Sequence, residues 1–247
     1  MTAIEIDTDD GRCPAHVFRP SDVGDGPWPA VLMYMDGIGM RPALCDMARR
    51  LAGMGYYVLL PDVFYRAGAY TAPDPTALFG DPAVRAEHFK KFMAAASVDM
   101  VMRDTRAFLA HLAAQPDVVQ PKVGVVGYCM GAKMALAAAG TFGERIAAAA
   151  GYHPGNIAVD APDSPHLLAD KMRARIYVGG AMEDQTFPDE QKQRLEKALT
   201  DAHVDHVIET YPARHGWVPS DTPVHDPVQA ERHWQTLTDL LAATLVR

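Results

Sequence analysis

The chain has 247 residues, of which 49% are hydrophobic and 22% charged, and its formal net charge is −8. This length and composition are typical of a globular protein that can bury a sizeable core. The acidic balance argues against a nucleic-acid partner, which would favour a basic face.

The N-terminal segment and the cysteines bear on where the protein is found. Residues 1–12 are acidic where a secretory signal needs a basic start and an apolar run, and no stretch is long enough to span a membrane. Cys13, Cys45 and Cys129 are odd in number and far apart, which argues against a disulfide framework. We therefore expect a cytoplasmic protein with reduced thiols and no membrane partner.

Strand-like and helix-like segments alternate along the chain. Residues 3–8 and 15–19 predict an opening hairpin turned at Asp9-Asp10-Gly11, and a polar loop follows from Ser21 to Pro29. Further strands are expected at residues 30–35, 56–60, 122–126, 146–152, 175–178 and 204–210. Helices are expected at residues 44–54, 85–114 with room for a break, 130–139, 189–202 and 227–245. Residues 64–92 form a lid-like segment, irregular from Tyr65 to Pro82.

This alternation predicts the fold class. Repeated βα units joined by short loops indicate a mostly parallel, doubly wound sheet with helices on both faces. The opening hairpin adds an antiparallel edge, and residues 1–247 make one domain. Ligands bind such sheets at the carboxyl ends of the strands, so the residues that follow each strand are the candidates for a site.

A nucleophile elbow follows the strand at residues 122–126. Gly127-Tyr128-Cys129-Met130-Gly131 has the Gly-x-nucleophile-x-Gly pattern between a strand and an alanine-rich helix. Small residues at both ends of the motif let strand and helix approach closely. Cys129 then lies at a helix N-terminus, which favours a thiolate, and the N–H of Met130 is placed to donate to an oxyanion. The alternative is a buried structural cysteine.

The base and its acid are expected after the last two strands, in the order nucleophile, acid, histidine. His215 directly follows the last strand. Asp184 is the expected acid rather than its neighbour Glu183, and Asp189 more simply begins the next helix. The spacing of His203 and His206 could suggest a metal, but no matching third ligand is evident, so no metal site is expected.

The loop after the strand at residues 30–35 should supply the second oxyanion donor. It reads Asp36-Gly37-Ile38-Gly39-Met40-Arg41-Pro42, and its glycines allow a close approach of backbone to a ligand. Asp36 lies near the expected thiolate, where it could disfavour the charge or accept the thiol proton. It could equally be a loop aspartate turned to solvent.

These motifs together resemble the dienelactone hydrolase (carboxymethylenebutenolidase) family of the α/β-hydrolase superfamily. The resemblance runs along essentially the whole chain. It rests on Asp36-Gly37-Ile38-Gly39, on Tyr57 to Phe64, on the cysteine elbow, on Gly151-Tyr152, on Asp184 and on Tyr211-x-x-x-His215-Gly216-Trp217. It implies an α/β-hydrolase fold, a triad of Cys129, His215 and Asp184, and an oxyanion hole from the backbone of Gly37 and Met130.

The resemblance also implies a role for the acid at position 36, which meets the resting thiol and leaves it when substrate binds. Family members usually carry glutamate there, and this chain has the shorter Asp36. Members that open dienelactones hold the substrate carboxylate with arginines, one of them shortly after the histidine, where this chain has none. Arg66 or Arg85 could supply that charge, and Tyr128 and Trp217 are further candidates to line the pocket.

The predicted function is hydrolysis of a small ester or lactone through a thioester on Cys129, without a metal or organic cofactor. Two alternatives remain. The site could act on other acyl or phosphoryl compounds, because the fold hosts many reactions. It could also belong to a non-catalytic thiol-sensing or binding protein. The oligomeric state is left open.

Overall fold

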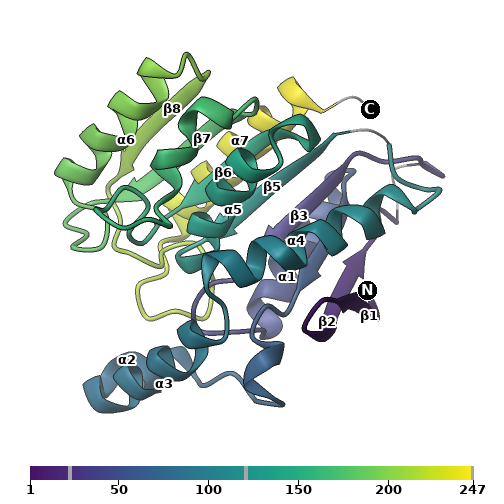
Figure 1. Cartoon of the computed structure of the whole chain (residues 1–247). Helices are drawn as coiled ribbons and strands as arrows, with labels where there is room; N and C mark the ends of the chain where they lie inside the picture. The colour runs from purple at the N-terminus through teal and green to yellow at the C-terminus, as the bar shows by residue number, and fades with distance from the viewer. Residues whose placement is uncertain (22–23, 120–121, 246–247) are drawn as a thin grey trace.

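The computed structural model describes residues 1–21, 24–119 and 122–245, and its centre is one eight-stranded sheet (Figure 1). The strands run in the spatial order β1-β2-β4-β3-β5-β6-β7-β8. Their bounds are β1 Thr2–Thr8, β2 Gly11–Phe18, β3 Ala30–Tyr34, β4 Tyr57–Pro61, β5 Val123–Tyr128, β6 Ile146–Tyr152, β7 Arg175–Ala181 and β8 His206–Tyr211.

The pairing of the strands confirms a mostly parallel sheet with an antiparallel N-terminal edge. β1 pairs antiparallel with β2 and β2 antiparallel with β4, whereas every pair from β4 through β3 to β8 is parallel. β3 and β5 are fully buried apolar runs, as expected for strands covered on both faces. The carboxyl ends of the six parallel strands therefore share one edge of the sheet.

Helices cover both faces of the sheet (Figure 1). Their bounds are α1 Pro42–Gly53, α2 Pro75–Gly80, α3 Pro82–Ala94, α4 Val98–Ala113, α5 Met130–Thr141, α6 Asp189–Asp201 and α7 Pro227–Thr244. In Figure 1, α4 and α5 lie in front of the sheet and α1 and α7 behind it. Arg50 of α1 pairs with Glu231 of α7 across the rear layer. None of the helices within the described residues has the length and apolarity of a membrane span.

The expected helix at residues 85–114 is two helices. The first ends at Ala94, and Ser97 caps the second, because its hydroxyl accepts a hydrogen bond from the Met100 N–H at 3.3 Å. α3 starts earlier than expected, at Pro82, because Asp81 accepts hydrogen bonds from the Ala83 and Val84 N–H groups. The segment expected to be irregular also holds α2, which Asp74 caps. α2 and α3 project beyond the carboxyl edge of the sheet (Figure 1).

The remaining differences from the sequence-based expectation are shifts of element ends. β2 begins at Gly11 rather than at residue 15, because residues 11–14 continue the ladder with β1. β5 extends through Tyr128, which pairs with Tyr152 of β6, and so reaches the elbow itself. Residues 22–23 of the expected Ser21-to-Pro29 loop lie outside the described residues.

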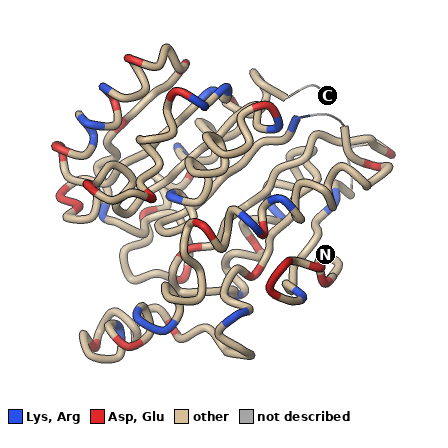
Figure 2. Tube along the Cα trace, in the orientation of Figure 1, with Lys and Arg blue, Asp and Glu red and all other residues tan. Residues whose placement is uncertain are grey.

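Charged residues of both signs are interspersed along the outer helices (Figure 2). On α6, Asp189 pairs with Lys192, Glu190 with Arg194, and Asp201 with Lys197, each at helical spacing. The same helix packs on the core through its buried residues Leu195 and Leu199.

The turn from β5 into α5 is held by two close backbone approaches. A Cβ at Gly127 would lie 1.9 Å from the Gly131 carbonyl oxygen, and one at Gly131 would lie 2.4 Å from that of Met35. Both contacts are with backbone, which cannot swing aside, so these positions require glycine. The glycine spacing of the elbow is therefore a packing requirement of the strand–turn–helix unit.

We predict that Gly131→Ala lowers the free energy of unfolding by about 3 kcal/mol, because the added methyl group overlaps the end of β3. Gly53→Ala is the matched control, since a Cβ at Gly53 meets nothing within 4 Å. It should raise the free energy of unfolding by about 0.5 kcal/mol. Denaturant unfolding followed by circular dichroism measures both, and equal stability of the two variants would contradict the packing argument.

Candidate active site

Five chemically distinctive residues follow five parallel strands at the carboxyl edge of the sheet. Gly37 follows β3, Cys129 follows β5, His153 follows β6, Asp184 follows β7, and His215 follows β8. This edge is where doubly wound sheets bind ligands. The structure thus brings together the segments that the sequence singled out, and it adds His153.

Cys129 has a left-handed backbone conformation at the start of α5. Its φ is 54° and its ψ −114°, unusual for a residue other than glycine and typical of strained functional turns. The Cys129 N–H donates to the Tyr152 carbonyl oxygen at 3.1 Å, which fixes the turn to β6. The residue is partly exposed, unlike buried Cys13. Cys129 therefore stands at the N-terminus of α5, where the helix dipole favours negative charge.

His215 is oriented by Asp184. The Nδ1 atom of His215 lies 2.7 Å from Oδ2 of Asp184. The other oxygen, Oδ1, accepts hydrogen bonds from the Thr186 N–H at 2.8 Å and the Thr186 hydroxyl at 2.7 Å. Asp184 is buried, whereas Glu183 is exposed and Asp189 begins α6. Both carboxylate oxygens of Asp184 are thus engaged, which leaves it one orientation toward the histidine.

Opposing effects set the charge of this pair. Burial disfavours the imidazolium, but the negative charge of the Cys129 thiolate and hydrogen bonds with Asp184 and Cys129 outweigh it and raise the pKa of His215 to about 10. Burial also opposes the charge of Asp184, but hydrogen bonds from His215 and Thr186 hold its pKa below the ordinary value. The arrangement therefore favours the protonated form of His215 beside an ionised Asp184.

Residues of the lid-like segment, 64–92, hold the loop after β3 in place. The Nε2 atom of His88 on α3 lies 2.9 Å from the Gly37 carbonyl oxygen. A Cβ at Gly37 would lie 3.0 Å from the ring of Phe89, the next residue on α3. Tyr70 accepts a hydrogen bond from the Met40 N–H at 2.9 Å. These contacts hold the peptide that was expected to donate to an oxyanion, and the oxyanion role of Gly37 and Met130 stays a prediction.

Asp36 is buried in an ion pair that the sequence did not reveal. Its two carboxylate oxygens accept hydrogen bonds from Nη1 and Nη2 of Arg41 at 2.7 and 2.9 Å. Arg41 also reaches Asp221 in the loop after His215, with Nε 2.7 Å from Oδ2. Asp36 also accepts the Ile38 N–H at 3.0 Å. No hydrogen bond joins Asp36 to Cys129 among the described residues, so its role at the nucleophile stays a prediction.

Two adjoining hollows open at Cys129. The outer one has a volume of about 600 Å³ and the inner one about 240 Å³. Both are lined by Gly37, Phe79, Phe89, Cys129 and His215. The outer hollow adds Arg85 and Lys133, and the inner one adds His153, Thr222 and Val224. Together they leave room for a small organic molecule next to Cys129.

The structure places the four weaker pocket candidates differently. Arg85 lines the outer hollow. Arg66 is not brought to it, because Asp104 binds its guanidinium through two hydrogen bonds of 2.7 and 2.8 Å and Asp10 adds a third contact. Tyr128 is fully buried with its hydroxyl 3.0 Å from Nε2 of His233 on α7, and Trp217 is fully buried against Tyr211. Both aromatic residues pack in the core behind the site.

Two residues at the site were missed by the sequence analysis. Thr186 has no motif of its own, because its role depends on a turn that folds it back onto Asp184. His153 did carry a signal, since it directly follows a parallel strand. Its proximity to His215, with ring centroids 5.2 Å apart, becomes visible only when β6 and β8 are placed in the sheet.

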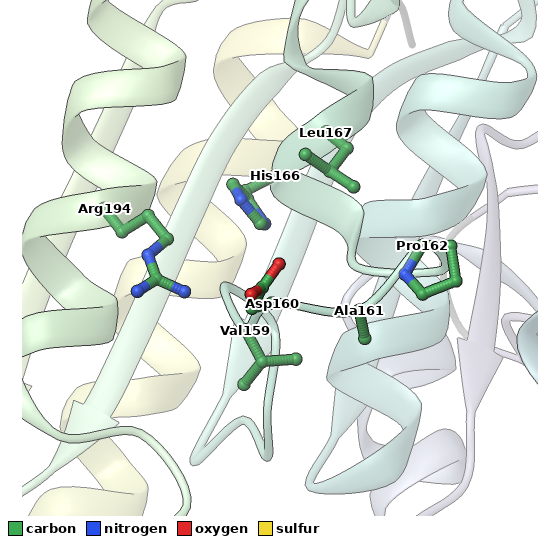
Figure 3. Close-up of a pocket in the computed structure, with 7 residues that line it drawn as sticks. All are labelled: Val159, Asp160, Ala161, Pro162, His166, Leu167 and Arg194. Atoms are coloured by element: carbon green, nitrogen blue, oxygen red, sulfur yellow. The ribbon is translucent and has the colours of Figure 1, made fainter.

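A separate hollow of about 500 Å³ lies between residues 159–167 and α6 (Figure 3). Two of its polar side chains, Arg194 and His166, already have partners. Arg194 donates to the Ala158 carbonyl at 3.1 Å and to Glu190, and Nδ1 of His166 lies 2.8 Å from the Ser164 hydroxyl. Cys129 does not line it. The cleft at Cys129 is therefore the candidate active site.

We predict that Asp36→Asn lowers the free energy of unfolding by about 3 kcal/mol, because it leaves the buried charge of Arg41 with one carboxylate instead of two. Asp221→Asn is the matched control. Its side chain is 31% exposed against 4% for Asp36, so its loss should cost less. Thermal and denaturant unfolding measure the difference, and an equal cost for the two substitutions contradicts the buried-pair argument.

Comparison with known proteins agrees with this architecture. The chain matches the sequence model of the Dienelactone hydrolase family over residues 13–245. It is 24% identical to a provisionally named carboxymethylenebutenolidase of Synechocystis sp. over 99% of this chain and 97% of that protein.

Solved structures show the same fold. A provisionally named dienelactone hydrolase of Klebsiella pneumoniae superposes with a TM-score of 0.83 at 22% identity, covering 98% of this chain and 97% of that one. A dienelactone hydrolase-like promiscuous phosphotriesterase from metagenomic libraries gives a TM-score of 0.77 at 23% identity, covering 99% of both chains. The sheet order and these likenesses identify an α/β-hydrolase fold. Because the family match spans nearly the whole chain, this protein belongs to the dienelactone hydrolase family.

Proposed function

We propose that this hydrolase cleaves small esters or lactones through a thioester on Cys129. The observation that carries the proposal is the chain of contacts from Asp184 through His215 to Cys129 at the mouth of the cleft. Each member has the role that acyl transfer requires: a nucleophile, a base and a group that orients the base. A thiol that only senses oxidants needs no oriented histidine.

The proposed reaction has two halves. The Cys129 thiolate attacks the acyl carbon, and the N–H groups of Gly37 and Met130 hold the oxyanion. The C–O bond then breaks, His215 gives its proton to the leaving alkoxide, and a thioester remains on the sulfur atom. His215 next takes a proton from water, the hydroxide adds to the thioester, and the C–S bond breaks to return the thiolate. A lactone suits this order, because its leaving group stays tethered. The chemistry requires no metal or organic cofactor.

We predict that Cys129→Ala lowers kcat/KM on phenyl acetate and small lactones about a thousandfold or more. Cys45→Ala is the matched control, because Cys45 is also a partly exposed free cysteine, on α1 away from the cleft. It should keep full activity. Intact-mass analysis after rapid quenching should find one acetyl group on wild type and on Cys45→Ala, but none on Cys129→Ala.

Other outcomes of this assay decide between the alternatives. Turnover of a phosphotriester but of no ester or lactone would indicate phosphoryl chemistry, and the expected adduct would then be absent. Failure of wild type on every substrate, together with rapid oxidation of Cys129 by peroxide, would favour a thiol sensor. Full activity of Cys129→Ala would remove the basis of the proposal.

We predict an alkaline limb near pH 10 in the kcat/KM profile. Because its pKa is raised to about 10, His215 keeps the proton for the leaving alkoxide below that pH and loses it above, so the rate falls as the pH rises through 10. Asp184→Asn removes a hydrogen bond and a charge that favour the imidazolium, so the limb should move down by about one pH unit or more. An unmoved limb in Asp184→Asn would assign it to another group.

A further inference from the structure

His153 is fixed by its backbone beside the inner hollow. It follows the last residue of β6 with a φ of 38°, in the left-handed region, and its N–H donates to the Gly179 carbonyl oxygen of β7 at 2.8 Å. The backbone of His153 is thereby fixed at the end of β6, whereas packing alone sets its side-chain torsions. The residue is 1% exposed, yet it lines the inner hollow together with Cys129 and His215.

The His153 ring has aromatic neighbours but, in the part of the chain that the structure describes, no hydrogen-bond partner in another residue. Its centroid lies 5.2 Å from that of His215 and 5.0 Å from that of Trp217, in edge-on contacts. Neither ring nitrogen has a partner among the described residues. Buried polar atoms in proteins are nearly always hydrogen-bonded, because leaving them unpaired is costly. Each ring nitrogen exposes less than 1 Å², so a ligand in the hollow can satisfy this imidazole once the ring rotates to present a nitrogen to it.

The other polar side chains of the inner hollow are already satisfied. Arg41 engages both carboxylate oxygens of Asp36. The Thr222 hydroxyl donates toward the Gly216 and Pro219 carbonyl oxygens. Apart from the reacting pair, His153 is the one polar side chain lining this hollow that lacks a partner within the described part of the chain. The remaining wall is made of residues such as Phe79, Phe89 and Val224.

His153 is uncharged. Burial, together with the positive charges of His215 and Arg41, holds the pKa of His153 well below its ordinary value. A neutral imidazole offers one N–H donor and one lone pair. It complements a hydroxyl group, which can both accept and donate. A carboxylate would find no free positive charge on His153 to offset its desolvation.

We propose that His153 is a specificity-determining residue that hydrogen-bonds an uncharged hydroxyl group on the part of the ester or lactone that enters the inner hollow. The inference rests on the proposed hydrolase function, and it names the substrate class. The preferred substrate is a hydroxylated, uncharged ester or lactone. A group that is complementary to an otherwise unpaired buried partner gains affinity, and an analogue without it is rejected.

Matched lactones test this inference. Wild type is assayed on γ-butyrolactone and on its α-hydroxy and β-hydroxy derivatives, which differ only in the hydroxyl group. We expect kcat/KM on at least one hydroxylated lactone to exceed that on the parent about tenfold. This ratio corresponds to the free energy that one hydrogen bond contributes to binding. The gain should lie mainly in KM, because the bond is also present in the ground state. The preference should be the same at pH 7 and pH 9, since the ring stays neutral.

Two variants and a control assign the preference to the ring. His153→Phe keeps an aromatic shape and removes both polar atoms, so it should lose the preference while still hydrolysing γ-butyrolactone. His153→Gln can donate and accept, so it should keep part of the preference. Thr222→Val removes a hydroxyl group that lines the same hollow but is already paired, and the preference should survive. If His153→Phe does not fold, as judged by thermal unfolding, His153→Met takes its place.

The outcomes separate this inference from the function on which it rests. If wild type hydrolyses the parent lactone but prefers neither hydroxylated one, the inference is wrong and the hydrolase function stands. The same holds if His153→Phe keeps the preference, or if it slows all three lactones equally, which would indicate a packing role. If wild type hydrolyses no lactone and no phenyl acetate, the proposed function itself fails.

Discussion

The close approach of α5 to the ends of β3 and β5 is the constraint on which the rest of the site depends. Gly127 and Gly131 permit it, because a methyl group at either position would meet backbone atoms. The approach forces Cys129 into a left-handed conformation at the first turn of the helix. It also brings the β3 loop, with Gly37, to the wall of the hollow that Cys129 lines. The expected nucleophile and the expected oxyanion donors are thus placed by one packing contact.

Buried charges then connect the loops around the sulfur atom. Arg41 joins the β3 loop to the loop after His215 through Asp36 and Asp221. Asp184 joins the turn after β7 to His215. Each carboxylate that is buried at the site has a cationic or hydrogen-bonding partner, which offsets its desolvation. The charges therefore serve orientation, and the walls left for a ligand are mainly apolar.

Two side chains that line the hollows differ from this pattern. His153 is buried, neutral and unpaired within the described residues, whereas Arg85 is a cation that lines the outer hollow. The two differ in the groups that they would select, so the outer and inner hollows have different chemical preferences. Family membership fixes neither, because specificity lies in the side chains grafted on a shared fold.

The sequence by itself determined the sheet class and the strand–turn–helix elbow at Cys129, and it singled out His215 and Asp184, whose contact the structure shows. These features depend on local patterns: apolar runs, glycine spacing and order along the chain. Element ends and the break at Ser97 needed the ladder pairings and caps of the folded chain. Only the tertiary structure decided that Arg41 pairs with Asp36, that Arg66 is bound elsewhere, and that His153 lies beside His215. Those contacts join side chains that are far apart in the chain, or side chains whose positions are set by the conformation of a loop. No local sequence pattern encodes such distances.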